Sequence, residues 1–255
     1  MSSPYQHLHY KEVYYIDTDR REQGHSGDFT YKIKIPQQCD SVSVLQASIP
    51  KSYYLVQSNN NTFSLIEDQN EYLITIPEGN YSMRVFLNVL TNLLNTVGSY
   101  TYTISYPDST QPDTGKFTYS VSNNTTQPIF QFDAHTTIVR QMGFENGGTY
   151  QFSSNKLISS NILNFQKSNI VYILSDICIS HGAQQQTQSV LQELFCGDTF
   201  DYSRIQYLNN DVILNSKKIS NVHQDSFTFT LVDEDLNVLN LNGQEVAISL
   251  VCFKR

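Results

Sequence analysis

The chain repeats one pattern from end to end: short runs in which apolar and polar residues alternate. Clear examples occupy residues 29–35 and 227–231. Side chains of a β-strand point alternately to opposite faces, so each run describes a strand with one dry face and one wet face. Strand runs punctuated by turns favour a sandwich or jelly roll over a parallel α/β sheet. The sequence therefore predicts a mainly β protein folded as an antiparallel jelly-roll β-sandwich.

One segment follows a different period. Between residues 83 and 94, apolar side chains recur every three or four positions, which places them on one face of an amphipathic helix. Asn80 or Ser82 is available as the N-cap. A second helix is expected at about residues 136–142.

The change of period also predicts the domain organisation. We expect residues 77–146 to form an inserted α/β subdomain, a helix plus a hairpin, within a jelly-roll framework of residues 1–76 and 147–255. Residues 1–10 are expected to form a flexible N-terminal arm.

Two local predictions concern the C-terminal half. Residues 189–195 are expected to form a helical turn. Residues 227–232 are expected to meet the segment 239–252 as a terminal hairpin, joined by the acidic turn that begins at Asp233.

Composition excludes several classes of function. Charged residues make up 16% of the chain, against about 25% in ordinary proteins, so much of the polar surface consists of Asn, Gln, Ser and Thr. The formal net charge is -8, and the molecule as a whole therefore repels a polyanion. We expect no specific nucleic-acid partner.

The cysteines and the N-terminus indicate the compartment. Cys39, Cys178, Cys196 and Cys252 have neither C-x-x-C nor zinc-ligand spacing, which favours reduced, buried thiols. The N-terminus lacks the features of a signal peptide, and no apolar run approaches the ~20 residues that span a bilayer. The sequence predicts a soluble protein made in a reducing, cytoplasm-like compartment, without membrane insertion.

Three patterns deserve testing as chemical sites. His7, His9 and Glu12 resemble the H-x-H-x(3,4)-E metal motif of cupins, but the glutamate stands one residue too close and the trio lies in the expected arm. The loop at residues 24–27 places a serine beside a histidine, but it leads into a strand, whereas a nucleophile elbow joins a strand to a helix.

The third pattern is the acidic turn. Asp233, Asp235 and Asn237 match the first ligands of a calcium loop, but Val238 and Gln244 stand where that loop requires Gly and Glu. A hairpin turn accounts for these residues without a metal. We therefore predict no catalytic residues, no metal and no cofactor.

The doubled tyrosines are candidates for an oligomer interface. Tyr14 with Tyr15, and Tyr53 with Tyr54, place one ring on each face of a strand. One ring of each pair needs a partner outside the local core, and tyrosine is enriched in protein interfaces. A second sheet of the same subunit would serve equally well.

Several segments, taken in order, carry a resemblance to a known family. They are IPKSYYLV (49–56), NTFSLIE (61–67), ITIPEGNYS (74–82), MGF (142–144), FTLVDED (229–235) and LNLNGQEVAISL (239–250). This succession resembles the penton-type minor capsid proteins of virophages and Polinton-like viruses. The loop after the first strand departs from the family pattern D-S-R-D-R, since residues 17–21 read DTDRR.

The resemblance implies a single jelly roll, often elaborated by an inserted domain, that forms homopentamers at icosahedral five-fold vertices. Its partners are then further copies of itself and a double-jelly-roll major capsid protein, and its location is the virion. The sequence leaves two alternatives open. One is a receptor- or glycan-binding jelly-roll module on a particle surface or fibre, and the other is a cupin-like metalloenzyme.

Overall fold

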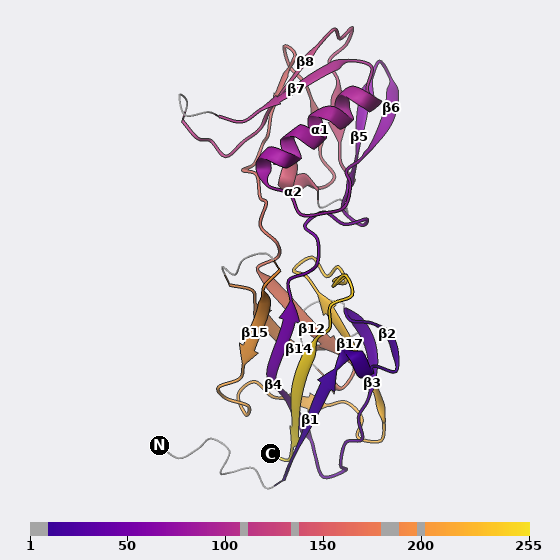
Figure 1. The fold of residues 1–255 in the computed structure, drawn as a ribbon, viewed down its shortest axis with the longest axis vertical. Coiled ribbons are helices and arrows are strands. Elements are labelled where there is room, and N and C mark those ends of the chain that lie inside the picture. The colour runs from indigo at the N-terminus through magenta and orange to yellow at the C-terminus, as the bar shows by residue number, and fades with distance from the viewer. Residues whose placement is uncertain (1–9, 108–111, 134–137, 180–188, 198–201) are drawn as a thin grey trace. The chain divides into compact units, whose positions relative to one another are not determined.

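The computed structural model describes residues 10–107, 112–133, 138–179, 189–197 and 202–255 (Figure 1). The chain divides into two compact units. Unit 1 comprises Met1–Tyr53 and Ser168–Arg255, and unit 2 comprises Tyr54–Lys167.

Within the described ranges, unit 1 consists of two antiparallel sheets. The six-stranded sheet runs in the order β1 (Lys11–Asp17), β18 (Ala247–Phe253), β4 (Ser41–Pro50), β16 (Lys217–Ile219) and β13 (Cys178–Ile179), with β15 (Arg204–Leu208) also paired to β4. The five-stranded sheet runs in the order β14 (Ser189–Phe195), β12 (Ile170–Ser175), β17 (Ser226–Val232), β3 (Asp28–Lys32) and β2 (Gln23–His25). A short 3-10 helix, Thr18–Arg20, follows β1.

The strand pairs of unit 1 are nested along the chain. β1 pairs with β18, β3 with β17, β4 with β15, and β12 with β14. Each pair encloses the next pair in the sequence, as in one long hairpin that has been rolled up. β18 also pairs with β4, and β17 with β12, which joins the nested pairs into two sheets. This connectivity is a jelly roll, and it confirms the predicted fold class.

The apolar side chains of the alternating runs fill the space between the two sheets. Phe227, Phe229 and Leu231 of β17 are fully buried, and Phe29 of β3 lies beside them. The opposite sheet contributes β-branched and leucine side chains to the same core. The dry faces predicted from the sequence therefore meet each other across the sandwich.

The predicted terminal hairpin is wrong. β17 pairs with β3 and β12, whereas β18 pairs with β1 and β4 in the other sheet. The turn itself is tight, since the Leu239 amide donates to the Leu231 carbonyl at 2.9 Å. Residues 240–246 then carry the chain across to the other sheet. Both strands show dry faces because they cover one core from opposite sides.

The helical turn expected at residues 189–195 is also wrong, because this segment is strand β14. Its register with β12 shifts so that Gln192 faces Ile173 while Val190 faces Leu174. The shift leaves Leu191 as the extra residue of a β-bulge. Leu191 and Leu194 are both buried, and their spacing of three mimics a helical period.

The described residues of unit 2 form two smaller antiparallel sheets and two helices. One sheet has the order β10 (Thr149–Gln151), β9 (Ile129–Gln131), β5 (Thr62–Glu67) and β6 (Asn70–Thr75). The other has the order β11 (Lys156–Ile158), β8 (Thr118–Ser122) and β7 (Thr101–Ser105). The helices are α1 (Met83–Val97) and α2 (Val139–Met142).

Helix α1 confirms the helical period. It begins after Ser82, whose Oγ accepts a hydrogen bond from the Val85 amide at 3.3 Å. Phe86, Leu90 and Leu94 form its buried face. Residues 134–137, where the second helix was expected to begin, lie outside the described residues, and α2 covers the rest of that segment.

The boundaries of unit 2 differ from the predicted 77–146. β5 and β6 precede residue 77, but β5 pairs with β9 and belongs to the same sheet. β10 and β11 follow residue 146 and pair with β9 and β8. Cuts at residues 77 and 146 would sever both sheets, so the compact unit extends from Tyr54 to Lys167.

Candidate interaction surface

The outer face of the six-stranded sheet of unit 1 carries the candidate site. Alternation directs one set of side chains into the core and the other set outward. The strand registers align the outward set in two rows across four strands. The rows are Tyr15, Ser249, Gln46 and Leu208, and beside them Asp17, Ala247, Ser48 and Gln206.

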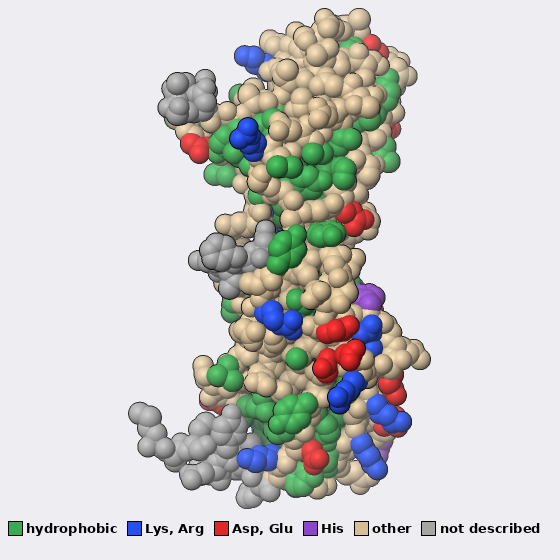
Figure 2. Space-filling view, viewed as in Figure 1, with side chains coloured by type: hydrophobic (Ala, Val, Ile, Leu, Met, Phe, Trp, Pro, Cys, Tyr) green, Lys and Arg blue, Asp and Glu red, His purple; other side chains and the backbone are tan. Residues whose placement is uncertain are grey.

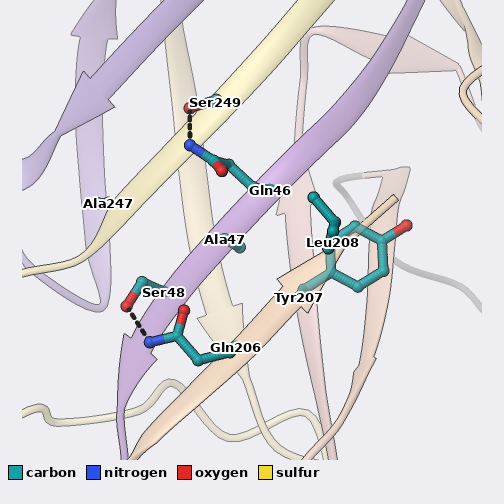
Figure 3. Close-up of a pocket in the computed structure, with 8 residues that line it drawn as sticks. All are labelled: Gln46, Ala47, Ser48, Gln206, Tyr207, Leu208, Ala247 and Ser249. Atoms are coloured by element: carbon teal, nitrogen blue, oxygen red, sulfur yellow. Dashed lines mark hydrogen bonds between the residues drawn. The ribbon is translucent and has the colours of Figure 1, made fainter. Parts of the chain in front are cut away.

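A shallow groove of about 360 Å³ lies along these rows (Figure 3). Its lining comes from β4, β15 and β18: Gln46, Ala47, Ser48, Gln206, Tyr207, Leu208, Ala247 and Ser249. The Gln46 Nε2 donates to the Ser249 Oγ at 3.2 Å, and the Gln206 Nε2 donates to the Ser48 Oγ at 3.0 Å. Each glutamine amide is thus held by a hydroxyl on the neighbouring strand.

An arginine anchors the end of the second row. The Arg204 Nε donates to the Ser48 Oγ at 2.7 Å, and its Nη2 donates to the carbonyl oxygens of Ser48 and Glu245 at 3.0 and 2.9 Å. The guanidinium therefore bridges β15, β4 and the segment that leads into β18. It stabilises the sheet surface at that end of the groove.

The chemistry of this face suits contact with another protein. The groove lining contains no carboxylate, imidazole, thiol or amine. Leu208 of the lining is 70% exposed, and Tyr15 at the end of the same row is 74% exposed. Interface cores are depleted in charge and enriched in tyrosine. Figure 2 shows apolar patches on the visible face of unit 1, with most of the acidic and basic side chains of that face toward one flank.

The structure separates the four tyrosines that the sequence singled out. Tyr15 points outward, whereas Tyr14 packs against the core and its hydroxyl donates to the Lys34 carbonyl at 2.7 Å. Burial raises the pKa of Tyr14. Tyr53 is only 2% exposed and lies in the core of unit 1, and Tyr54 is half-buried. Of these four residues, Tyr15 is therefore the one that we retain as a candidate interface residue.

No pattern in the sequence predicts the role of Glu245. Its carboxylate accepts hydrogen bonds from the Thr18 hydroxyl, from the Ser26 Oγ at 3.0 Å and from the Arg21 Nη1 at 3.2 Å. The Thr18 hydrogen bond, followed by Ser26 and the charge of Arg21, lowers the pKa of Glu245, while desolvation opposes the shift. Glu245 thus ties the loop after β1 to the start of β18.

The same contacts settle the role of the loop at residues 24–27. The Ser26 hydroxyl is directed to Glu245, and the His25 Nδ1 accepts a hydrogen bond from the Gly27 amide at 3.2 Å. A Cβ on Gly27 would lie 1.9 Å from the Leu239 carbonyl oxygen, so the close approach of two backbones requires glycine there. The serine and the histidine make separate structural contacts.

The two candidate metal patterns resolve differently. His7 and His9 lie outside the described residues, and Glu12 accepts a hydrogen bond from the Tyr10 hydroxyl at 3.0 Å. Asp233 accepts the amides of Asp235 and Asn237 at 2.9 and 2.8 Å, which closes the turn after β17. Burial raises the pKa of the Asp233 carboxyl. Within the described ranges, no three His, Cys, Asp or Glu side chains are grouped so that they could hold a metal ion.

The four cysteines are free and buried. Burial raises the pKa of both Cys178 and Cys252 to about 12. These thiols therefore stay protonated at neutral pH and react slowly while the fold is intact. None of the helices in the described part of the chain is long and apolar enough to cross a membrane.

Neither a family model nor a curated protein matches the sequence. Among solved structures, the chain is similar to the selenomethionine-labelled mavirus penton protein, with 10% identity and a TM-score of 0.48. The alignment covers 96% of this chain and 100% of that chain. A likeness at this identity and this score does not identify a function.

Proposed function

We propose that this protein is a structural subunit of an icosahedral virion, a penton-type protein that forms homopentamers at the capsid vertices. One observation carries the proposal: a single jelly roll is interrupted between β4 and β12 by a complete compact unit. Jelly rolls serve in viral capsids, lectins and cupins. The ordered sequence segments described above resemble capsid vertex proteins, for which an inserted domain in a single jelly roll is the expected architecture.

The outer face of the six-stranded sheet, which carries the groove and is called the groove face, is a candidate contact for such a ring. Five identical copies close into a ring only through a heterologous contact, in which one surface of each copy meets a different surface of the next. The groove lining carries no charged side chain, and Leu208 of that lining and Tyr15 of β1 are exposed. Its amides and hydroxyls suit a protein contact better than they suit acid–base chemistry, because none of them titrates near neutral pH.

The proposal includes a second partner. A vertex ring in a double-jelly-roll shell contacts the surrounding major capsid protein, which we therefore propose as the hetero-partner. The proposed location is the virion, and the proposed role involves no catalysis.

Imaging of the native particle tests the proposal directly. Cryo-electron microscopy of purified virions is expected to show density for this chain, with its jelly roll and its inserted unit, at every five-fold vertex. A particle whose vertices hold another protein would overturn the proposal.

A variant tests the groove contact. Leu208→Asp places a carboxylate at an exposed position of the groove lining. It should leave folding intact and reduce the yield of five-membered rings in co-expression with the major capsid protein. Leu73→Asp, at an exposed leucine of β6 in unit 2, is the matched control. Equal ring yields for the two variants would exclude the groove face as the contact.

A further inference from the structure

Strand β1 ends the six-stranded sheet and has an unoccupied side. In the sheet order its one neighbour is β18, and no other strand among the described residues pairs with it. Lys11, Glu12, Val13, Tyr15 and Asp17 are exposed. An edge of this kind is a template for pairing with another strand unless the protein blocks it.

The backbone direction of each residue in β1 follows from its two ends. The Lys254 amide donates to the Tyr10 carbonyl at 3.2 Å, and the Thr18 amide donates to the Val246 carbonyl at 3.1 Å. The register between these bonds is unbroken. In an antiparallel ladder successive residues alternate between the two sides. Even-numbered residues of β1 therefore face β18, and Val13, Tyr15 and Asp17 direct their amides and carbonyls to the open side.

This alternation restricts how a second copy of β1 can pair there. In an antiparallel contact, residues that direct their backbone groups to the open edge must face one another. Registers that place odd-numbered residues opposite odd-numbered residues of the second copy satisfy this condition. Among them, the register centred on Tyr14 pairs the whole strand Lys11–Asp17 with itself.

The side chains complement one another in that register. Lys11 lies opposite Asp17 of the second copy, and Val13 lies opposite Tyr15 of the second copy, with both contacts repeated by the two-fold symmetry. All four side chains lie on the outer face of the sheet, because they share the odd positions of β1. Opposite charges and aromatic–β-branched pairs are the cross-strand combinations that stabilise an antiparallel sheet.

We propose that β1 is a two-fold docking edge for a second copy of this chain, pairing antiparallel about Tyr14 and joining two six-stranded sheets into one. The occupant is specified by charge complementarity and by backbone direction, which the same register satisfies together. The contact is isologous and therefore differs from the heterologous contact of the proposed ring. It goes beyond the proposed function, and it lets two rings or two free subunits associate.

Cysteine crosslinking of the full chain tests the register. In the proposed pairing, residue 13 faces residue 15 of the second copy with Cα atoms about 5.5 Å apart, which is within disulfide range. Residue 13 lies diagonally from residue 13 of the second copy, beyond that range. A mixture of Val13→Cys and Tyr15→Cys proteins is expected to give a disulfide-linked dimer joining the two variants under mild oxidation, and neither variant alone is expected to do so. The native thiols are buried and do not interfere.

Charge exchange tests the complementarity. Lys11→Asp or Asp17→Lys alone converts two attractive contacts per dimer into repulsive ones, so self-association measured by sedimentation should weaken about tenfold. The double variant Lys11→Asp/Asp17→Lys restores opposite charges and should return to within about twofold of the wild type. Circular dichroism checks that each variant remains folded.

The outcomes separate this inference from the proposed function. Any one of three results would overturn the docking edge: no mixed disulfide, equal crosslinking in all samples, or no recovery of association in the double exchange. The charged residues of β1 would then act to keep the edge unpaired. Rings are assayed separately, on the wild-type chain co-expressed with the major capsid protein. Rings in that assay together with no mixed disulfide between the cysteine variants would contradict the edge alone. A mixed disulfide together with no rings of the wild-type chain would support the edge and contradict the pentamer.

Discussion

The two units reach a β-rich fold in opposite ways. In unit 1 the strands that pair come from opposite ends of the chain, as β1 and β18 do. In unit 2 every paired strand lies within Tyr54–Lys167. Contacts between distant residues carry a larger loop-closure entropy and form more slowly. Unit 1 therefore depends on its last strand, whereas unit 2 has all its partners in one continuous segment.

The cores differ as well. The core of unit 2 contains a network of aromatic rings. The ring centroid of Phe130 lies 5.3 Å from that of Phe63 and 5.2 Å from those of Tyr119 and Phe152. In unit 1, Phe229 stacks on Phe29 with ring centroids 5.5 Å apart. Aliphatic side chains and thiols make up most of the surrounding core. The alternation of a strand thus leaves the choice between aromatic and aliphatic filling open.

The cysteines provide a way to observe the units separately. All four thiols lie in unit 1, and all four are buried. Labelling with a thiol reagent therefore reports the opening of unit 1, while the tyrosine signal of the near-ultraviolet spectrum includes the aromatic network of unit 2.

Removal of β18 should break unit 1 and spare unit 2. A chain that stops after Val246 loses the strand between β1 and β4 together with the buried Ile248 and Leu250. We expect Cys39, Cys178 and Cys196 to react at the rate of an unfolded chain. Proteolysis should still yield a resistant fragment that corresponds to unit 2.

The matched control stops after Phe253 and removes the two exposed residues that follow β18. It should label as slowly as the wild type. Slow labelling of the chain that lacks β18 would show that the sandwich closes without its last strand, and the contrast between the units would fail.

Phenylalanine truncation should distinguish the two cores. Phe130→Ala and Phe229→Ala should each cost about 3–5 kcal/mol of unfolding free energy. Phe130 should lie at the upper end because it contacts more rings. Denaturant titration gives the loss, and thiol labelling should quicken for Phe229→Ala alone. Faster labelling in Phe130→Ala would mean that the two units unfold as one.

The sequence correctly predicts those elements of the fold that depend on contacts between neighbouring residues. The dry face of β17 and the helix that begins after Ser82 follow from side-chain period and capping, which involve neighbouring residues. The period failed at β14, because a bulge puts Leu191 and Leu194 on one face. It also failed to separate β17 from β18, since two strands that cover one core from opposite sheets have the same pattern as a hairpin.

The candidate surface lay further from the reach of local sequence. The doubled tyrosine at Tyr14 and Tyr15 predicted one outward ring, and the structure places Tyr15 there. The groove, however, requires Gln46, Gln206 and Ser249 to become neighbours, and they belong to three strands far apart in the chain. Their proximity depends on sheet order and register, which single-strand alternation does not encode.

A buried carboxylate supplies a smaller contrast. Glu67 of unit 2 is 2% exposed and accepts hydrogen bonds from the Ser99 amide at 2.6 Å and from the Tyr102 hydroxyl at 2.6 Å. Glu67→Gln turns one acceptor into a donor that faces another donor, so it should cost about 1–3 kcal/mol. Denaturant unfolding measures the loss, and thiol labelling should stay at the wild-type rate.

The control for that variant is Glu78→Gln, at an exposed glutamate of unit 2. It should change the unfolding free energy by less than about 0.5 kcal/mol. A loss for Glu67→Gln as small as for the control would mean that the hydrogen bonds to Glu67 add little to the stability of unit 2.

The smallest effect is expected at Glu245 of unit 1, where it should depend on pH. Hydrogen bonds from Thr18 and Ser26 and the charge of Arg21 hold the pKa of this carboxyl below its ordinary value of 4.5. A depressed folded-state pKa stabilises the fold above the unfolded-state pKa, and this stabilisation is lost as pH falls through the folded-state pKa. Because Glu245 is partly exposed, Glu245→Gln should cost at most about 1 kcal/mol at neutral pH. The difference between wild type and variant, measured by denaturant unfolding with thiol labelling, should shrink as the solution becomes more acidic than the ordinary value. A difference that persists unchanged in acid would mean that the geometry of the contact, rather than the charge, links the loop after β1 to β18.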